Sequence, residues 1–221
     1  MIVVHHLNAS RSQRILWLLE ELGLDYEIRH YSRDPKTMLA PAGLRAVHPL
    51  GKSPVITDDG VTVAETGAIV EYIIEKYGDG RLIPPAGTDE RRRYSYWLHY
   101  AEGSAMPFLT MKLIFDEMPK HSPFFVRPVL RMIRRRIGDA YLDPNIGAHV
   151  RYWEDTLAAS AWFAGGDLTG ADIMMSFPVE TANARGALRG NFSRVNAFLA
   201  AIHARPAWLR ALEKGGPYPY A

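Results

Sequence analysis

The 221-residue sequence contains no cysteine. Without thiols the chain forms no disulfide bond, no thiolate metal site and no cysteine-based redox centre. It also has no apolar run near the roughly 20 residues that a membrane-spanning helix needs, and its start, MIVVHHLN, lacks the basic leader of a signal peptide. We therefore expect a cytoplasmic protein with no membrane partner.

A strong charge of one sign is missing as well. The net charge is only +2, which is too small to predict binding to nucleic acid or to an anionic membrane. One face of a predicted helix carries four arginines, Arg127, Arg131, Arg134 and Arg135, and the opposite face is apolar. A row of like charges on a helix is usually a solvated surface. The hydrophobic share of 48% and the charged share of 23% are typical of a globular protein.

A predicted β-hairpin and the helix after it form the most informative stretch. Two β-favouring runs, residues 55–57 and 61–63, flank a short turn that ends in Gly60. Helical spacing follows, and the helix is expected to begin near Glu65 and Thr66. A helix start offers free N–H groups and the positive end of the helix dipole, both of which favour a carboxylate. With the Glu65 charge beside it, this arrangement suits a zwitterion such as the α-amino acid end of a peptide.

The first part of the chain reads as a small α/β domain. We expect a strand at residues 2–7, a helix at 11–22, a second strand at 26–31 and a short helix around 36–44, followed by the hairpin and its helix. The β-α-β unit implies a parallel pair with a right-handed crossover. The order βαβ-α-ββα is that of a thioredoxin-like domain, which we assign to residues 1–79.

After a linker at residues 80–88, no convincing strand remains. We expect an all-α domain over residues 89–221, opening with a helix at 90–115 that bends near Pro107, because an interior proline breaks the hydrogen-bond ladder. Thr169 and Asp172 have the spacing of a capping box. The other predicted helices cover residues 126–137, from Pro144 through 157, 194–203 and 206–213, and the first of these has an apolar face of Val126, Val129, Leu130, Ile133 and Ile137.

Two adjacent histidines, His5 and His6, lie in the first predicted strand. Successive strand side chains point to opposite faces, so the two rings cannot hold one metal ion together. We expect one histidine to pack inside and the other to face solvent, and we expect no metal site.

The pattern Gly51-Lys52-Ser53-Pro54, followed by Glu65-Thr66-Gly67-Ala68-Ile69, resembles the glutathione-binding half of the glutathione transferase superfamily. The resemblance implies a cis Pro54, a backbone contact from Ser53 to the cysteinyl part of glutathione, and a γ-glutamyl end held by Glu65 and Thr66. Similarity extends along the chain, because Leu168–Ile173 resembles the family's helical capping motif.

The sequence leaves the roles of two residues near this pattern, Lys52 and His48, undecided. Lys52 is either a contact for the glycyl carboxylate of glutathione or a solvated surface lysine. His48 occupies a loop position at which the family often has a polar residue. We include both in the predicted glutathione site.

Ser10 is the predicted catalytic residue. Read structurally, Ser10 and Gln13 form a capping box at the start of the first helix, with Ser10 as the N-cap. The segment Ser10–Glu20 also resembles the serine-type transferases, most of all a fungal and bacterial branch, in which a serine at this position donates its O–H to the glutathione thiolate. The two roles are compatible, because the oxygen lone pairs cap the helix while the proton stays available. Ser12 is the rival, on the second residue of the helix and less well aimed.

The resulting hypothesis is a cytosolic, homodimeric glutathione transferase that uses glutathione as co-substrate, needs no metal and acts on an apolar electrophile. The dimer is implied by the resemblance alone. Candidates for the electrophile pocket on the long helix are Tyr100, Ser104 and Met111. The alternatives are a glutathione-binding regulatory module without turnover, or a glutathione-dependent peroxidase, isomerase or dehalogenase that uses the same Ser10.

Overall fold

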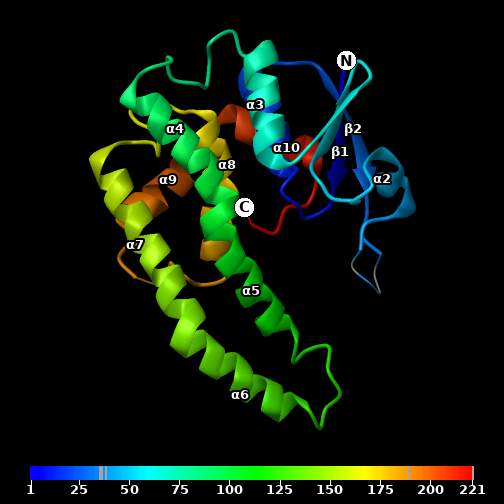
Figure 1. The fold of residues 1–221 in the computed structure, drawn as a ribbon, viewed down its shortest axis with the longest axis vertical. Coiled ribbons are helices and arrows are strands. Elements are labelled where there is room, and N and C mark those ends of the chain that lie inside the picture. The colour runs from blue at the N-terminus through cyan, green and yellow to red at the C-terminus, as the bar shows by residue number, and fades with distance from the viewer. Residues whose placement is uncertain (35–36, 38, 189, 221) are drawn as a thin grey trace.

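The computed structural model describes residues 1–34, 37, 39–188 and 190–220. A four-stranded sheet with its helices lies on one side of the molecule, and a bundle of helices lies beside it and forms the rest (Figure 1). The strand order is β2-β1-β3-β4, with β1 parallel to β2 and antiparallel to β3. The strands are β1 (Ile2–Leu7), β2 (Tyr26–Tyr31), β3 (Val55–Asp58) and β4 (Val61–Ala64). The predicted thioredoxin-like arrangement is confirmed.

Three helices belong to the sheet half: α1 (Gln13–Leu22), α2 (Ala42–Val47) and α3 (Thr66–Tyr77). Helix α1 ends at Gly23, which has a φ of 65° and donates its N–H to the carbonyls of the last turn, the left-handed ending that favours glycine. Nearly every residue of α1 is buried, because the sheet lies on one side of it and α8 (Gly170–Ala184) and α10 (Pro206–Gly215) pack on the other.

Two predicted helix boundaries in this half are wrong. Helix α1 begins at Gln13, not at Arg11. Helix α2 begins at Ala42, whereas a helix was expected around residues 36–44; residues 36 and 38 of that range lie outside the described part of the chain. Pro41 precedes α2 with an extended backbone. A proline disfavours the helical conformation in the residue before it, which moves the start of the helix past this point.

The helical half begins with one long element that is interrupted once. Helix α4 (Asp89–Tyr100) continues through the π-helical turn η1 (Ala101–Ala105) into α5 (Met106–Glu117). The irregularity predicted at Pro107 therefore lies in the turn just before it. A second π-helical turn, η2 (Gly138–Leu142), likewise precedes Pro144 in α7 (Asp143–Ala159). The remaining elements are α6 (Arg127–Ile137), η2 (Gly138–Leu142), α7 (Asp143–Ala159), α8 (Gly170–Ala184), α9 (Ser193–His203) and α10 (Pro206–Gly215).

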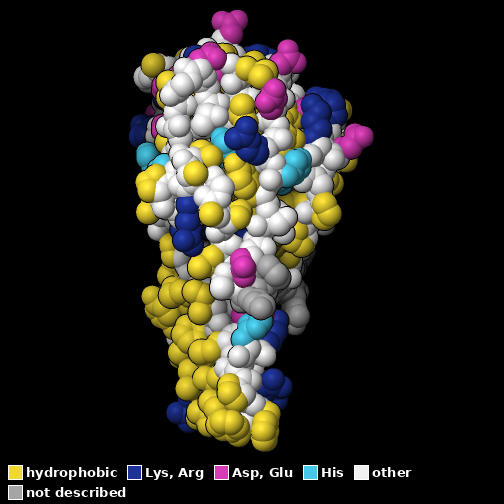
Figure 2. Space-filling model, turned by 90° about the vertical axis from the view of Figure 1, so that its right-hand side faces the viewer, with side chains coloured by type: hydrophobic (Ala, Val, Ile, Leu, Met, Phe, Trp, Pro, Cys, Tyr) yellow, Lys and Arg dark blue, Asp and Glu magenta, His cyan; other side chains and the backbone are white. Residues whose placement is uncertain are grey.

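Helices α5 and α6 project from the body as a hairpin (Figure 1). The apolar face predicted for α6 does not form core: none of the α6 residues is fully buried, and Val129 is 51% exposed. Phe124 and Phe125 at the tip are 79% and 69% exposed, and Figure 2 shows apolar side chains gathered over this end. The face fails to form core because the hairpin lies beyond the main hydrophobic cluster.

The predicted capping box opens α8. Thr169 and Asp172 exchange the hydrogen bonds of that motif, and the Asp172 carboxylate also accepts the Phe163 N–H at 2.8 Å. Burial raises the pKa of Asp172 to about 6. The motif fixes the start of a helix whose residues are almost all buried.

The prediction for the two histidines is half wrong, because both are buried, at 2% and 4% exposure. His5 lies 3.0 Å from the Tyr31 hydroxyl, while His6 faces His30 and Ser12. Both faces of β1 are covered, so neither ring reaches solvent.

Candidate active site

Ser10 lies in the loop that joins β1 to α1. Its Oγ accepts the Ser12 N–H at 3.2 Å, and it lies 2.7 Å from Ser12 Oγ and 3.4 Å from Ser53 Oγ. The helix N-cap is Ser12 rather than Ser10, so the predicted position is off by two residues. The side-chain nitrogen and oxygen of Gln13 have no hydrogen-bond partner among the described residues, so the reciprocal capping box is absent. Ser10 instead closes a local turn that holds the first residues of the helix.

Ser12 lies behind Ser10, away from the surface. Its side chain is fully buried, and its Oγ is 2.9 Å from His6 Nδ1. Burial lowers the pKa of His6 to about 4, so the imidazole is neutral at neutral pH. A buried chain of three polar groups therefore runs from His6 through Ser12 to Ser10, and Ser10 is its outer end.

A cavity of about 400 Å³ lies beside the β3–β4 hairpin, and we call it the hairpin cavity. It brings together all six residues that were predicted to bind glutathione. They are His48, Lys52, Ser53, Pro54, Glu65 and Thr66. Residues separated by up to 18 positions in the sequence thus share one wall, because the loop before β3 and the start of α3 lie at the same edge of the sheet.

The backbone at this edge has two special features. The Ser53–Pro54 peptide bond is cis, as the family resemblance implied. Ser53 Oγ donates to the His5 carbonyl at 3.0 Å and accepts the Leu7 N–H at 3.3 Å, which ties the loop to β1 and occupies the side chain.

Glu65 has a φ of 73° and immediately precedes the first residue of α3, Thr66. A positive φ at a non-glycine residue is unfavourable and recurs at functional sites. Here it sets a carboxylate next to free N–H groups at a helix start, which is the juxtaposition that the sequence predicted.

Glu102 and Arg14 were missed by the sequence reasoning. Glu102 comes from η1 in the helical half and lines the hairpin cavity. Arg14 is fully buried, donates to Glu102 and bonds the Met174 carbonyl at 2.6 Å. Although burial favours the neutral acid, the guanidiniums of Arg14 and Arg11 hold the pKa of Glu102 below its ordinary value. A second carboxylate therefore faces the cavity in its charged form.

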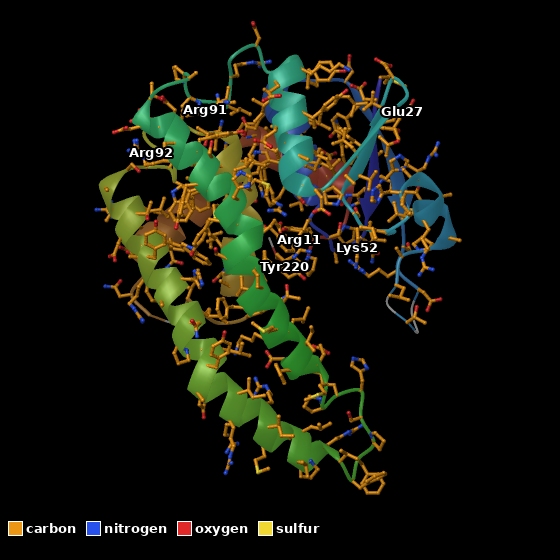
Figure 3. The ribbon with its side chains drawn as sticks, in the orientation of Figure 1. Arg11, Glu27, Lys52, Arg91, Arg92 and Tyr220 are labelled. Carbon is orange, nitrogen blue, oxygen red and sulfur yellow. The ribbon has the colours of Figure 1, made fainter. Side chains whose placement is uncertain are left out.

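A second cavity of about 300 Å³ opens between the two halves of the molecule, and we call it the interdomain cavity. Ser10, Arg11 and Lys52 line it from the sheet half, and Arg185 and Tyr220 line it from the other. Figure 3 shows Arg11, Lys52 and Tyr220 near one another where the two halves meet. Ser10 thus lies on the cavity that the helices and the sheet share.

The predicted electrophile residues lie elsewhere. Tyr100 is buried, bonded to His149 and 3.1 Å from Trp153 Nε1. Ser104 and Tyr100 line a separate groove on α4, and Met111 lines neither cavity described above. Other residues of α5 line the interdomain cavity, and their spacing of four and then three positions puts them on one face of the helix. They are Met106, Thr110 and Leu113.

The sequence and the fold were compared with known proteins. The family model for the glutathione S-transferase N-terminal domain matches residues 10–76. Glutathione S-transferase 3 of Schizosaccharomyces pombe is 36% identical over 97% of this chain and 88% of its own length. The chain belongs to the glutathione S-transferase superfamily.

Two further comparisons agree with this membership. Glutathione S-transferase 1 of Saccharomyces cerevisiae is 30% identical over 97% of this chain and 95% of its own length. The crystal structure of a glutathione S-transferase from Actinobacillus pleuropneumoniae has a TM-score of 0.79 and 32% identity, and the match covers 99% of this chain and 94% of that one. The transferase fold therefore extends over both halves of the molecule.

Two kinds of feature are absent from the described part of the molecule. No group of three or more His, Asp or Glu side chains there is arranged to hold a metal ion. None of its helices combines the length and apolarity needed to cross a membrane.

Proposed function

We propose that the protein is a glutathione transferase that activates the glutathione thiol at Ser10 and conjugates it to an electrophile. One observation carries the proposal: Ser10 lines the interdomain cavity and is 3.4 Å from Ser53, a residue that lines both cavities. A peptide held along the hairpin cavity with its thiol at Ser10 would present that thiol to a second substrate in the interdomain cavity.

The hairpin cavity supplies a complementary group for each charged end of glutathione. The free N–H groups at Thr66 suit the γ-glutamyl carboxylate, and Glu65 and the charged Glu102 suit the ammonium. Lys52 is exposed and also lines this cavity, and it suits the glycyl carboxylate. The Ser53 backbone, beside the cis proline, is left for the central cysteinyl residue.

Thiol activation follows from the position of Ser10. The Ser10 oxygen accepts the Ser12 N–H through a lone pair, and its hydroxyl makes only a long bond, to Ser53 Oγ at 3.4 Å. The hydroxyl proton can therefore turn from Ser53 to a bound sulfur. That hydrogen bond and the nearby N-terminus of α1 both stabilise S⁻ over SH, and helix N-termini are known to lower a thiol pKa from about 8.5. The thiol proton leaves to solvent, and the thiolate forms the new bond to carbon while the leaving group takes its bonding pair.

The test is a titration of bound glutathione, followed by thiolate absorbance against pH, in the wild type and in Ser10→Ala. A hydrogen bond to a charged group contributes about 1.5–3 kcal/mol, so the substitution should raise the bound thiol pKa by about 1–2 units at 1.36 kcal/mol per unit. Ser12→Ala is the matched control, because Ser12 is buried behind Ser10, and it should leave most of the shift in place.

Three outcomes separate the hypotheses. A low thiol pKa that rises only in Ser10→Ala supports the proposal. A larger rise in Ser12→Ala would assign the thiolate contact to the rival serine. Saturable binding with an unshifted thiol would instead favour a regulatory module without turnover.

We also propose, on the strength of the family, that the active form is a cytoplasmic homodimer.

A further inference from the structure

The interdomain cavity has an excess of positive charge. Five cationic side chains line it: Arg11, Arg33, Arg45, Lys52 and Arg185. No Asp or Glu of the described residues lines it. A cavity built only for apolar electrophiles would not need this excess, since burying charge beside an apolar ligand is unfavourable.

We propose that the second substrate is an aromatic electrophile that carries a carboxylate, and that Arg185 is the residue that binds this carboxylate. The inference deepens the proposed transferase function and rests on it. It also replaces the expectation of a purely apolar electrophile with a more specific substrate class.

The other four cations have partners, tasks or positions of their own, and Arg33 is among those that interact within the protein. Arg11 Nε is 3.1 Å from Glu102 Oε2, so its charge is largely neutralised within the protein. Lys52 lines the hairpin cavity as well, where the glycyl carboxylate of glutathione is expected. Arg45 is exposed, and its chain packs on Gly51 at the rim. Arg185 is therefore the cation best placed for a second substrate.

Arg185 is held firmly on the helical wall of the cavity. It caps the C-terminal end of α8, which is buried along most of its length, and it donates to the Leu109 carbonyl on α5. This bond uses Nη1, and the Tyr220 hydroxyl also hydrogen-bonds the guanidinium. The N–H groups that remain lie in a plane and can face the two oxygens of a carboxylate.

The half-buried Arg185 charge has no close counter-ion in the described structure. Asp116 is the acidic residue that interacts electrostatically with Arg185. Its Oδ1 is already paired with Arg134 Nε at 2.6 Å. Burial lowers the pKa of Arg185, but an arginine stays protonated at neutral pH. A carboxylate brought by a ligand would supply the missing opposite charge in a partly desolvated place, where such a pair is stronger than at an open surface.

Aromatic side chains next to Arg185 define the rest of the substrate class. Phe177 and Tyr220 line the same cavity, with ring centroids 5.3 Å apart and nearly perpendicular planes. The Arg11 guanidinium lies 5.3 Å from the centre of the Phe177 ring. A flat ring can pack against these groups, with its reacting carbon toward Ser10 and its acid toward Arg185.

The matched substrates for the test are 4-chloro-3,5-dinitrobenzoate and its methyl ester. In both, the glutathione sulfur attacks the ring carbon that bears chlorine; the C–S bond forms, the C–Cl bond breaks, and chloride leaves with the bonding pair. The two compounds differ in charge at a position that takes no part in the reaction. Dividing each kcat/KM by the uncatalysed rate constant with glutathione removes their difference in intrinsic reactivity.

We expect the full-length wild type to prefer the acid, and Arg185→Gln to reduce this preference roughly tenfold, chiefly through KM for the acid, because charge-assisted hydrogen bonds are about twice as strong as neutral ones. Arg185→Lys keeps the charge but loses the fork, so it should retain part of the preference. Arg151→Gln is the control, since Arg151 is exposed on α7 and lines neither cavity, and it should change nothing. Melting temperatures of all variants report whether the lost bond to Leu109 disturbs the fold.

Binding measurements separate failure of this inference from failure of the proposed function. Calorimetry would use the two S-aryl glutathione conjugates, acid and ester, and needs no turnover. Tighter binding of the acid conjugate that disappears in Arg185→Gln supports the inference even if the thiol titration shows no activation. An equal acid-to-ester ratio in the wild type and Arg185→Gln overturns it while the transferase proposal stands. If neither glutathione nor the conjugates bind, both proposals are overturned.

Discussion

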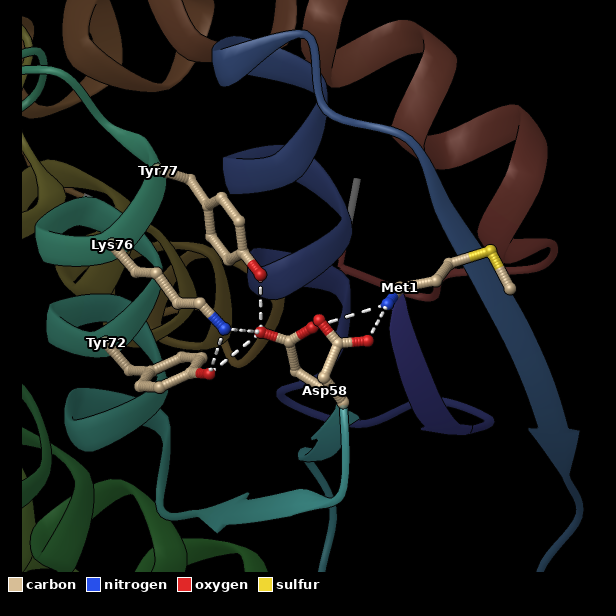
Figure 4. A network of polar contacts seen from close by, with 6 residues as sticks. Met1, Asp58, Tyr72, Lys76 and Tyr77 are labelled. Carbon is tan, nitrogen blue, oxygen red and sulfur yellow. Dashed lines mark hydrogen bonds and ion pairs between the residues drawn. The ribbon is translucent and has the colours of Figure 1, made fainter.

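Asp58 anchors the hairpin that carries much of the proposed glutathione site. It is the last residue of β3, its side chain is fully buried, and its Oδ2 accepts three hydrogen bonds (Figure 4). The donors are all on α3: Tyr72 at 2.8 Å, Lys76 at 2.7 Å and Tyr77 at 2.5 Å. Replacing Asp58 with asparagine should therefore loosen the hairpin from the end of α3.

The expected loss can be estimated from these bonds. Asparagine keeps one carbonyl oxygen but no charge, so three charge-assisted bonds become neutral or are lost, at about 1 kcal/mol each. Lys76 is 40% exposed and recovers part of its hydration. We therefore expect Asp58→Asn to lower the free energy of unfolding by about 2 kcal/mol. For a chain of this length that corresponds to a melting temperature lower by about 4–8 °C.

The pH dependence has a definite sign. Although burial favours the neutral acid, the hydrogen bonds from Lys76, Tyr77 and Tyr72 hold the pKa of Asp58 well below its ordinary value. Its contribution to stability is then fully present above the unfolded-state pKa of about 3.9 and disappears as pH falls through the lower folded-state pKa. The stability difference between wild type and Asp58→Asn should be constant from neutral pH down to about pH 5 and shrink only in stronger acid.

Urea unfolding followed by tryptophan fluorescence and circular dichroism would measure this difference, with coincident transitions as the condition for a single free energy. Asp59→Asn is the matched control: it is adjacent, 70% exposed and bonded to the N-terminal ammonium. A loss of the same size in both variants, or a difference that already declines above pH 5, would refute the account of a buried, ionised anchor.

Two further predictions concern the proposed site and assembly. Glu65→Ala should weaken glutathione binding by about tenfold, because it removes the partner of the ligand ammonium while leaving the start of α3 in place; isothermal calorimetry measures this, and an unchanged Kd would remove Glu65 from the site. Light scattering after gel filtration should give about twice the chain mass of 24.9 kDa if the proposed homodimer forms, whereas a monomer mass at micromolar concentration would contradict it.

Local sequence patterns predicted most of the fold because their causes are local. The hairpin was found from its turn, and Asp59 and Gly60 both have the positive φ that such a turn uses. Thr169 and Asp172 form their capping box within four residues. The boundary of α1 was missed because Ser10 and Ser12 are both acceptable caps, and only the position of the helix against the sheet selects between them.

Long-range packing explains what the sequence did not show. The apolar face of α6 follows the pattern of a buried helix, but its exposure depends on where the α5–α6 hairpin ends relative to the body. Arg14 lies in the middle of an apolar helix, where nothing in the local pattern indicates that Glu102, 88 positions later, would face it. Tyr100, Ser104 and Met111 do not line the interdomain cavity, because which face of the long helix meets the sheet half depends on the packing of the two halves.

The two cavities differ in how far apart in the sequence their residues lie, and this difference separates two aspects of the proposed function. Ser10 and the six predicted glutathione residues lie within the first 66 positions and are positioned by one sheet and two helix starts. Arg185 and Tyr220 reach the interdomain cavity from the far end of the chain. Because Arg185 is fixed through α8 and α5 and not through the β1–α1 loop, its substitution should alter the choice of electrophile while leaving the bound thiol pKa unchanged. The proposed thiol activation and the proposed selection of substrate charge would then be independent properties, set by separate halves of the molecule.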